Sequence, residues 1–101
     1  MATQTTAERY VALIDVDEPG AQNVQELAAI WGEIDNELDE IGVTVESSYT
    51  VLGEVDFIMI FEASDRESAF QADTVLGRRG LDVQTMEITP TEEFAQLVDE
   101  I

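Results

Sequence analysis

The residue types that this chain lacks restrict its chemistry more than those that it contains. It has 101 residues, with no cysteine and no histidine. Without cysteine it has no disulfide, no thiolate nucleophile and no cysteine-ligated zinc or iron–sulfur centre. Without histidine it has no Ser-His-Asp triad and no proximal histidine for haem. Acid or base chemistry is therefore left to carboxylates, hydroxyls and the two tyrosines, Tyr10 and Tyr49.

The residues that suggest a binding site belong to two adjacent segments in the middle of the chain. We predict that they share one face of a sheet and contact a ligand or a partner there: Ser48, Thr50, Asp56, Phe57, Met59 and Phe61. No catalytic residue, cofactor or metal site is predicted. The acidic clusters at 15–18 and 37–40 lack the ligand pattern of a calcium loop and are expected to hold only hydrated ions.

Each candidate residue has two interpretations. Asp56 is either a general base or, as is commoner beside a turn, an acceptor of backbone hydrogen bonds that fixes the turn. The hydroxyls of Ser48 and Thr50 either hold a polar ligand or stay solvated. The three large apolar side chains either line a pocket or pack in a subunit interface, and we favour the interface.

Apolar periodicity predicts two repeats of strand, helix and strand. Strands are predicted at 9–16, 43–52, 55–62 and 81–88, and helices at 22–41, 64–79 and 89–101. Capping boxes are predicted at Ser64–Glu67 and Thr89–Glu92. Gly42 and Gly80 are expected to end the first two helices, and Gly53 to form a type II′ hairpin turn.

This order of elements is that of an α+β, ferredoxin-like βαββαβ fold with an additional C-terminal helix and an antiparallel sheet. Residues 9–101 are predicted to form a single domain, and residues 1–8 a flexible N-terminus. In this topology the strands at 9–16 and 55–62 lie in the middle of the sheet. Both are apolar on both faces, whereas the helices cover only one face.

Pairing Leu52 with Val55 across the turn divides the strand 55–62 into two sides. Ile58 and Ile60 fall on the more uniformly aliphatic side, which we assign to the helices. The other side is expected to face away from them, with Phe57, Met59 and Phe61. An apolar patch of that size marks an interaction surface, so we predict that a second subunit covers it in a homodimeric α/β barrel.

The run Thr50–Asp65, with the helix and strand that follow and the segment Thr89–Phe94, resembles the GYD domain family of small dimeric α/β barrel proteins. The glycine and aspartate of its motif correspond to Gly53 and Asp56, and Val55 stands at the tyrosine position. The likeness covers most of the chain. It implies the fold and a dimer, and it implies no particular activity.

The chain is strongly acidic, with 23 acids, 4 bases and a formal net charge of -19. All the bases are arginines: Arg9, Arg66, Arg78 and Arg79. The acids are spread between periodic apolar positions, so they coat a folded body rather than form a disordered tail. We infer the cytosol of a salt-accumulating halophile, with an ordinary acidic surface protein as the alternative.

The charge also disfavours two classes of partner. Nucleic-acid binding depends on phosphate neutralisation by lysine and arginine, and anionic membranes attract the same residues. Neither partner is therefore expected. The N-terminus shows no basic segment followed by an apolar run, and a cytoplasmic location is predicted.

Two functions from different classes remain. We favour a non-catalytic module that binds a small molecule or acts in regulation through a partner protein. The alternative is a cofactor-independent monooxygenase or isomerase of the dimeric barrel type, with Asp56 or a tyrosine as base. A sealed interface would favour the module, and an open pocket around a desolvated carboxylate would favour the enzyme.

If the acidic coat is adapted to high salt, dilute buffer should destabilise the protein. We expect the melting temperature to fall as potassium chloride is reduced from about 1 M to about 0.1 M, because the Debye length grows from roughly 3 Å to 10 Å. Circular dichroism melting curves measure this, with sucrose in place of salt as the uncharged control. A melting temperature that does not change over the series would contradict the halophilic interpretation.

Overall fold

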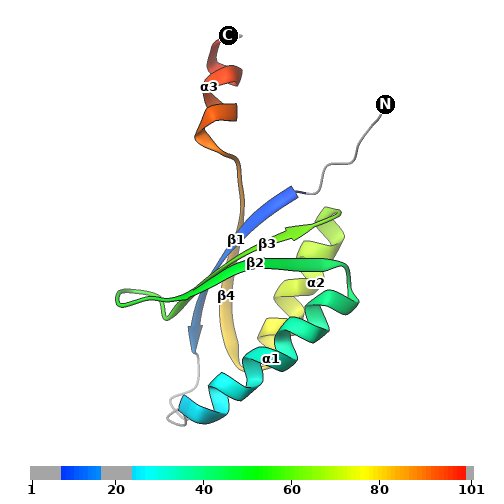
Figure 1. Ribbon diagram of the computed structural model, residues 1–101, viewed down its shortest axis with the longest axis vertical. Coiled ribbons are helices and arrows are strands. Elements are labelled where there is room, and N and C mark those ends of the chain that lie inside the picture. The colour runs from blue at the N-terminus through cyan, green and yellow to red at the C-terminus, as the bar shows by residue number, and fades with distance from the viewer. Residues whose placement is uncertain (1–7, 17–23, 100–101) are drawn as a thin grey trace.

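The computed structural model describes residues 8–16 and 24–99 (Figure 1). Its elements are β1 (Glu8–Val16), α1 (Val24–Glu40), β2 (Val43–Thr50), β3 (Phe57–Ala63), α2 (Arg66–Gly77), β4 (Leu81–Ile88) and α3 (Thr91–Asp99). This order confirms the predicted βαββαβ arrangement with a final helix. The start of the first predicted helix and most of the predicted N-terminal segment lie outside the described residues. Glu8, which we assigned to that segment, is the first residue of β1.

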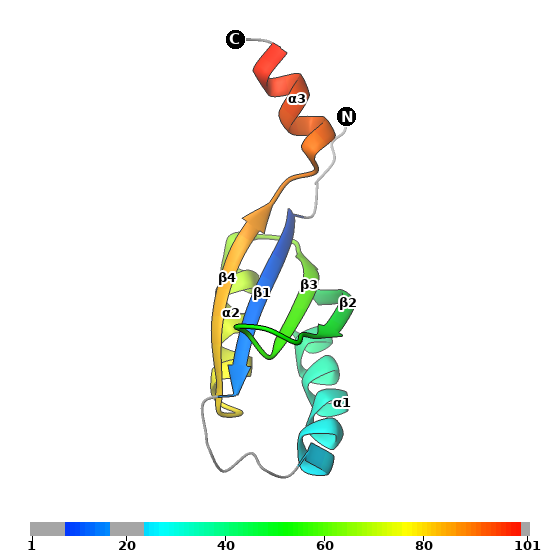
Figure 2. The ribbon, with the colours of Figure 1, turned by 90° about the vertical axis from the view of Figure 1, so that its left-hand side faces the viewer.

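The sheet has the strand order β2-β3-β1-β4, and its neighbouring strands are antiparallel. The prediction that β1 and β3 lie in the middle is therefore confirmed. Figures 1 and 2 show α1 and α2 against one face of the sheet, while α3 projects away beyond the end of β4. The helices α1 and α2 therefore bury one face of β1 and β3 and leave the other face uncovered.

The core lies between the sheet and the two helices α1 and α2. The ring of Tyr10 stacks on Phe61 with centroids 5.4 Å apart. The largest fully buried side chains are Phe61, Ile14, Ile34, Leu38, Met59, Leu76 and Val43. Each such side chain contributes about 1.5–3 kcal/mol relative to exposure, so this layer supplies most of the driving force for folding.

The predicted assignment of the two sides of β3 is wrong. Met59 and Phe61 are completely buried under the helices, and Phe57 packs against the same core. Ile58 and Ile60 point to the opposite side, which the helices leave open. The predicted register at the hairpin itself is confirmed, since Thr50 pairs with Phe57 and Ser48 with Met59.

A β-bulge explains the reversed faces. Glu46 is left without a partner, because the pairing shifts between Val45 and Ser47. An extra residue in one strand reverses its alternation beyond that point. Val45 therefore lies opposite Phe61 rather than on the side of Ile60. The aliphatic residues at the start of β2 join the aromatic side of β3, and together they form the face that the helices bury.

The hairpin loop is wider than the predicted type II′ turn. Such a turn needs a positive φ at its first central residue. Among the described glycines, only Gly42 and Gly80 have positive φ, so Gly53 does not form it. The amide of Asp56 turns away from β2 and donates to the carbonyl of Ile14 at 3.0 Å. The carbonyl of Asp56 still accepts from the amide of Val51 at 2.9 Å, so Val51 and Asp56 share only one of the two hydrogen bonds of a regular pair.

The helix ends combine confirmed and corrected predictions. Gly42 and Gly80 follow α1 and α2 with φ of 83° and 82°, as predicted for glycines that terminate helices. The N-cap of α2 is Asp65 rather than Ser64, because the Asp65 carboxylate accepts from the amide of Ser68 at 2.8 Å. This bond holds the pKa of Asp65 below its usual value.

Two ion pairs join the ends of α1 and α2. The guanidinium of Arg79 lies 2.7 Å from a carboxylate oxygen of Glu33 and 2.7 Å from one of Glu37. Both hydrogen bonds stabilise the charged guanidinium and raise the pKa of Arg79. Arg79, which follows α2, therefore links α2 to α1.

The helix α3 presents an apolar stripe to solvent. It begins at Thr91, two residues after the start of the predicted range, and the carbonyl of Pro90 accepts from the amide of Phe94 at 3.1 Å. None of its described residues is buried. Phe94 and Leu97 are 60% and 59% exposed, so the stripe that the sequence predicts is present but has nothing packed against it within the described chain.

The reversed faces can be tested by a matched pair of substitutions. Phe61→Ala should lower the free energy of unfolding by about 3–5 kcal/mol, because it removes a fully buried ring. Phe70→Ala removes a phenyl ring from the exposed side of α2 and should change the free energy of unfolding by about 0.5 kcal/mol or less. Urea denaturation in concentrated potassium chloride measures both. Equal effects would contradict the described packing.

Candidate functional site

The face of the sheet opposite α1 and α2 carries an apolar patch. Val11 lies between Ile60 and Met86 in neighbouring strands, and Leu13 lies beside Ile58. Four of these side chains are half-buried, and Met86 is 40% exposed. We call these five residues the open-face patch. The sequence predicts an apolar patch on the face away from the helices; the structure has one there, but different residues form it. Its use as an interaction surface stays a prediction.

Charged groups border the open-face patch at one end. Arg9 lies 3.1 Å from Glu46, the bulge residue, and 3.5 Å from Glu62. A hydrogen bond between the two carboxyl groups raises the pKa of Glu62 and lowers that of Glu46. An apolar centre with a polar rim is the usual anatomy of a protein interface.

Asp56 ties the hairpin loop to the end of β1. One of its carboxylate oxygens accepts from the amide of Val16 at 2.9 Å. Its own amide also approaches the carboxylate of Asp15 at 3.1 Å. The side chain is exposed and has the structural role that we considered commoner for it, as an acceptor of a backbone hydrogen bond.

Three predicted binding residues line one shallow cavity of about 240 Å³ on the helix side of the sheet: Ser48, Thr50 and Phe57. Trp31 of α1 borders the same cavity and meets Phe57 edge to face, with centroids 5.3 Å apart. Met59 and Phe61 lie in the core instead, and Asp56 lies at the loop. The six residues thus do not form a single sheet face, although binding at the cavity stays a prediction.

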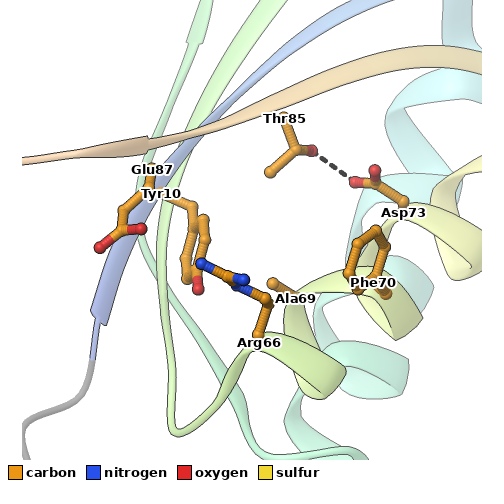
Figure 3. A pocket seen from close by; sticks show the side chains of 7 residues that line it. All are labelled: Tyr10, Arg66, Ala69, Phe70, Asp73, Thr85 and Glu87. Atoms are coloured by element: carbon orange, nitrogen blue, oxygen red, sulfur yellow. Dashed lines mark hydrogen bonds between the residues drawn. The ribbon is translucent and has the colours of Figure 1, made fainter.

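A second cavity, of about 260 Å³, lies between α2 and the strands β1 and β4 (Figure 3). We call it the α2–β4 cavity. Its lining residues are Tyr10, Arg66, Ala69, Phe70, Asp73, Thr85 and Glu87. Sequence reasoning missed this cavity, and the ring of Phe70, which borders it, is 67% exposed. The available signal was the position of Phe70 in the sequence. It directly follows the buried Ala69, so it lies about 100° around the helix axis from that residue, near the edge of the buried side.

Some polar side chains of the α2–β4 cavity already form hydrogen bonds with other residues of the protein. The hydroxyl of Tyr10 donates to Glu8 at 2.8 Å, and the hydroxyl of Thr85 donates to Asp73. Burial raises the pKa of Tyr10 to about 12, and the bond to Glu8 adds to this effect. Tyr10 therefore stays protonated at neutral pH, and its oxygen can still accept a hydrogen bond.

Neither a metal centre nor a membrane span is found in the part of the chain that the structure describes. No group of three or more carboxylates there is arranged to hold a metal ion. None of the described helices is both long and apolar enough to cross a bilayer.

The fold and these surfaces define a ferredoxin-like α+β domain with one helix-covered face and one open apolar face. Residues 10–98 match the GYD domain family, and the chain belongs to this family. The resemblance seen in the central hairpin is therefore confirmed.

Two further proteins are similar to this chain. A Thermus thermophilus protein named glutamine synthetase and cystathionine beta-lyase binding protein is 29% identical over 87 residues, which cover 84% of this chain and 92% of that protein. The leucine response regulatory protein LrpA of Mycobacterium tuberculosis has a crystal structure that matches with a TM-score of 0.53 and 16% identity. This match covers 80% of this chain and 49% of LrpA, so the chain spans about half of that protein and shares its fold.

The raised pKa of Tyr10 predicts a loss of stability in alkali. Folding favours the protonated tyrosine, so this contribution is complete below about pH 10, the ordinary tyrosine pKa, and is lost as the pH rises through the folded value of about 12. We expect the unfolding free energy to fall more steeply over this range in the wild type than in Tyr10→Phe. Urea denaturation at each pH measures it, and parallel curves would contradict the burial of the hydroxyl.

Proposed function

We propose that this protein is a non-catalytic interaction module that forms a homodimer through the open-face patch and binds a partner protein. The observation that carries the proposal is the patch itself: Val11, Leu13, Ile58, Ile60 and Met86 lie in the middle of a sheet face that α1 and α2 do not cover. Exposed contiguous apolar surface of this kind marks an interaction site.

A second copy of the chain suits this face for two reasons. The patch has no charge in its centre, so it is where two molecules with a formal net charge of -19 each can meet without placing carboxylates together. A two-fold axis also brings one surface against itself, and an apolar patch is complementary to its own copy. We propose a dimer of the α/β barrel type on this basis.

The exposed helix α3 supports the same arrangement. Isolated helices shorter than about 12–15 residues are marginal in water, so α3 depends on packing for its stability. It spans only Thr91–Asp99, and its apolar stripe has no described neighbour. It follows β4 directly, close to Ile88 on the open face. We propose that α3 packs against the second subunit and extends the interface.

The partner is proposed by similarity. The Thermus thermophilus relative is named for binding glutamine synthetase and cystathionine beta-lyase. We propose that this chain also binds one or both of the corresponding enzymes in its own organism. The net charge supports a setting in the cytoplasm of a salt-accumulating organism, where high ionic strength screens repulsion between acidic proteins.

No observation in the described residues favours the enzymatic alternative. Asp56 was the first choice of base, yet its carboxylate is exposed and is bonded to the amide of Val16. It does not line either of the cavities described above.

Dimer formation can be tested by placing a charge in the open-face patch. Ile60→Asp should give particles of about 11.2 kDa, the mass of one chain, where the wild type gives twice that mass. A buried unpaired carboxylate would cost several kcal/mol in the interface. Sedimentation equilibrium in concentrated potassium chloride measures the mass. Phe70→Asp, on the exposed side of α2, is the control and should stay dimeric; a dimeric Ile60→Asp variant would reject this interface.

Partner binding requires a separate measurement. We expect immobilised wild-type protein to bind purified glutamine synthetase or cystathionine beta-lyase from its own host in biolayer interferometry at high salt. Bovine serum albumin, another acidic protein, serves as the negative control. Failure of both enzymes to bind would contradict the proposed partners and would leave the dimer to be judged by sedimentation.

A further inference from the structure

We infer that the α2–β4 cavity is a binding site for a zwitterionic α-amino acid. The cavity places the exposed guanidinium of Arg66 and the exposed carboxylate of Glu87 beside apolar walls, and neither group forms an ion pair with a described residue. This inference names a small-molecule ligand for the proposed binding module. It does not depend on the dimer, because the cavity lies on the helix side of the sheet.

Arg66 is the first feature that points to a ligand. Only four residues of the chain are basic, and two of them, Arg9 and Arg79, each pair with two carboxylates. Arg66 and Arg78 are exposed and make no ion pair with any described residue, and of these two only Arg66 lines a cavity. It begins α2, where the helix dipole does not favour a cation. Figure 3 shows its guanidinium turned across the cavity toward Tyr10.

The anionic side of the cavity is divided between an engaged and a free carboxylate. Asp73 accepts the hydroxyl of Thr85, so that pair is already satisfied. Glu87 of β4 lines the cavity without a hydrogen bond to a described residue. Figure 3 places Glu87 and Arg66 near Tyr10, away from Asp73 and Thr85. One free positive and one free negative group therefore lie at the same end.

These charges select for a zwitterion. A simple anion would approach a protein with a net charge of -19, and a simple cation would meet Arg66. An α-amino acid carries both charges on neighbouring atoms and has no net charge. Its carboxylate would accept from the guanidinium of Arg66, which suits bidentate pairing. Its ammonium would donate to Glu87 and to the oxygen of Tyr10, whose proton is directed to Glu8.

The volume and the walls limit the rest of the ligand. A cavity of about 260 Å³ lies below the roughly 300–1,000 Å³ of sites for drug-sized ligands, so it suits a single small metabolite. The ring of Phe70 is 67% exposed beside Ala69 and would gain apolar contact with a ligand side chain. The Asp73–Thr85 pair closes the far end of the cavity.

The test is a titration of the full-length, isotope-labelled protein in concentrated potassium chloride, followed by amide chemical shifts. L-leucine is the probe. We expect shifts at Ala69, Phe70 and Thr85, and weaker binding by about tenfold or more for L-leucinamide and for N-acetyl-L-leucine, each of which lacks one of the two charges. L-phenylalanine and L-serine then report on the side-chain preference.

Matched variants separate the site from general salt effects. Arg66→Gln and Glu87→Gln should each weaken L-leucine binding by about tenfold. Arg78→Gln, at an exposed arginine outside the cavity, should leave it unchanged. Absence of shifts with all three amino acids, binding of L-leucinamide and N-acetyl-L-leucine as tight as that of L-leucine, or L-leucine binding that Arg66→Gln does not weaken would each overturn the inference.

Sedimentation of the same samples distinguishes this inference from the proposed dimer. A dimer that binds no amino acid overturns the cavity assignment alone. A monomer that binds L-leucine supports the cavity assignment and overturns the proposed interface. The two results therefore do not depend on each other.

Discussion

The structure depends on one constraint: its two central strands are apolar on both faces, and the two packed helices can cover only one. β1 and β3 lie in the middle of the sheet, and α1 and α2 bury the face that holds Phe61. The other face keeps the open-face patch, because the described chain has no further element packed there (Figure 2). An apolar surface of this extent is stable in water chiefly when it is covered. The fold therefore leaves an apolar surface on which the proposed dimer can form.

A single extra residue decides which side chains each face receives. The bulge at Glu46 changes the alternation of β2, so that its valines join the aromatic side of β3. The same residue then reaches Arg9 at the border of the open face, 3.1 Å away. One irregularity therefore both decides which side chains enter the core and places a charged group beside the open-face patch. Bulges often redirect side chains in this way, and they occur preferentially at sheet edges and near functional sites.

The scarcity of positive charge makes the position of each arginine informative. Arg79 joins α2 to α1, and Arg9 neutralises two carboxylates at the border of the open face. Both have evident structural roles. Arg66 and Arg78 pair with no described carboxylate, and only Arg66 of the two lies over a cavity with a free carboxylate. In a protein rich in lysine and arginine, an arginine without an ion pair would be ordinary. In this chain only 4 residues are basic and 23 are acidic, so an arginine without an ion pair beside a cavity suggests a ligand.

The sequence by itself determined the order of the elements, the central strands, the glycines that end α1 and α2, the family and the presence of an apolar face that the helices leave open. These depend on periodicity and turn residues, which act over a few neighbouring positions. Only the tertiary structure decided which face of β3 is buried, because a bulge leaves no local signal yet reverses every side chain beyond it. It alone also revealed the α2–β4 cavity, since Tyr10, Arg66 and Glu87 are far apart in the chain and meet only when β1, α2 and β4 pack together.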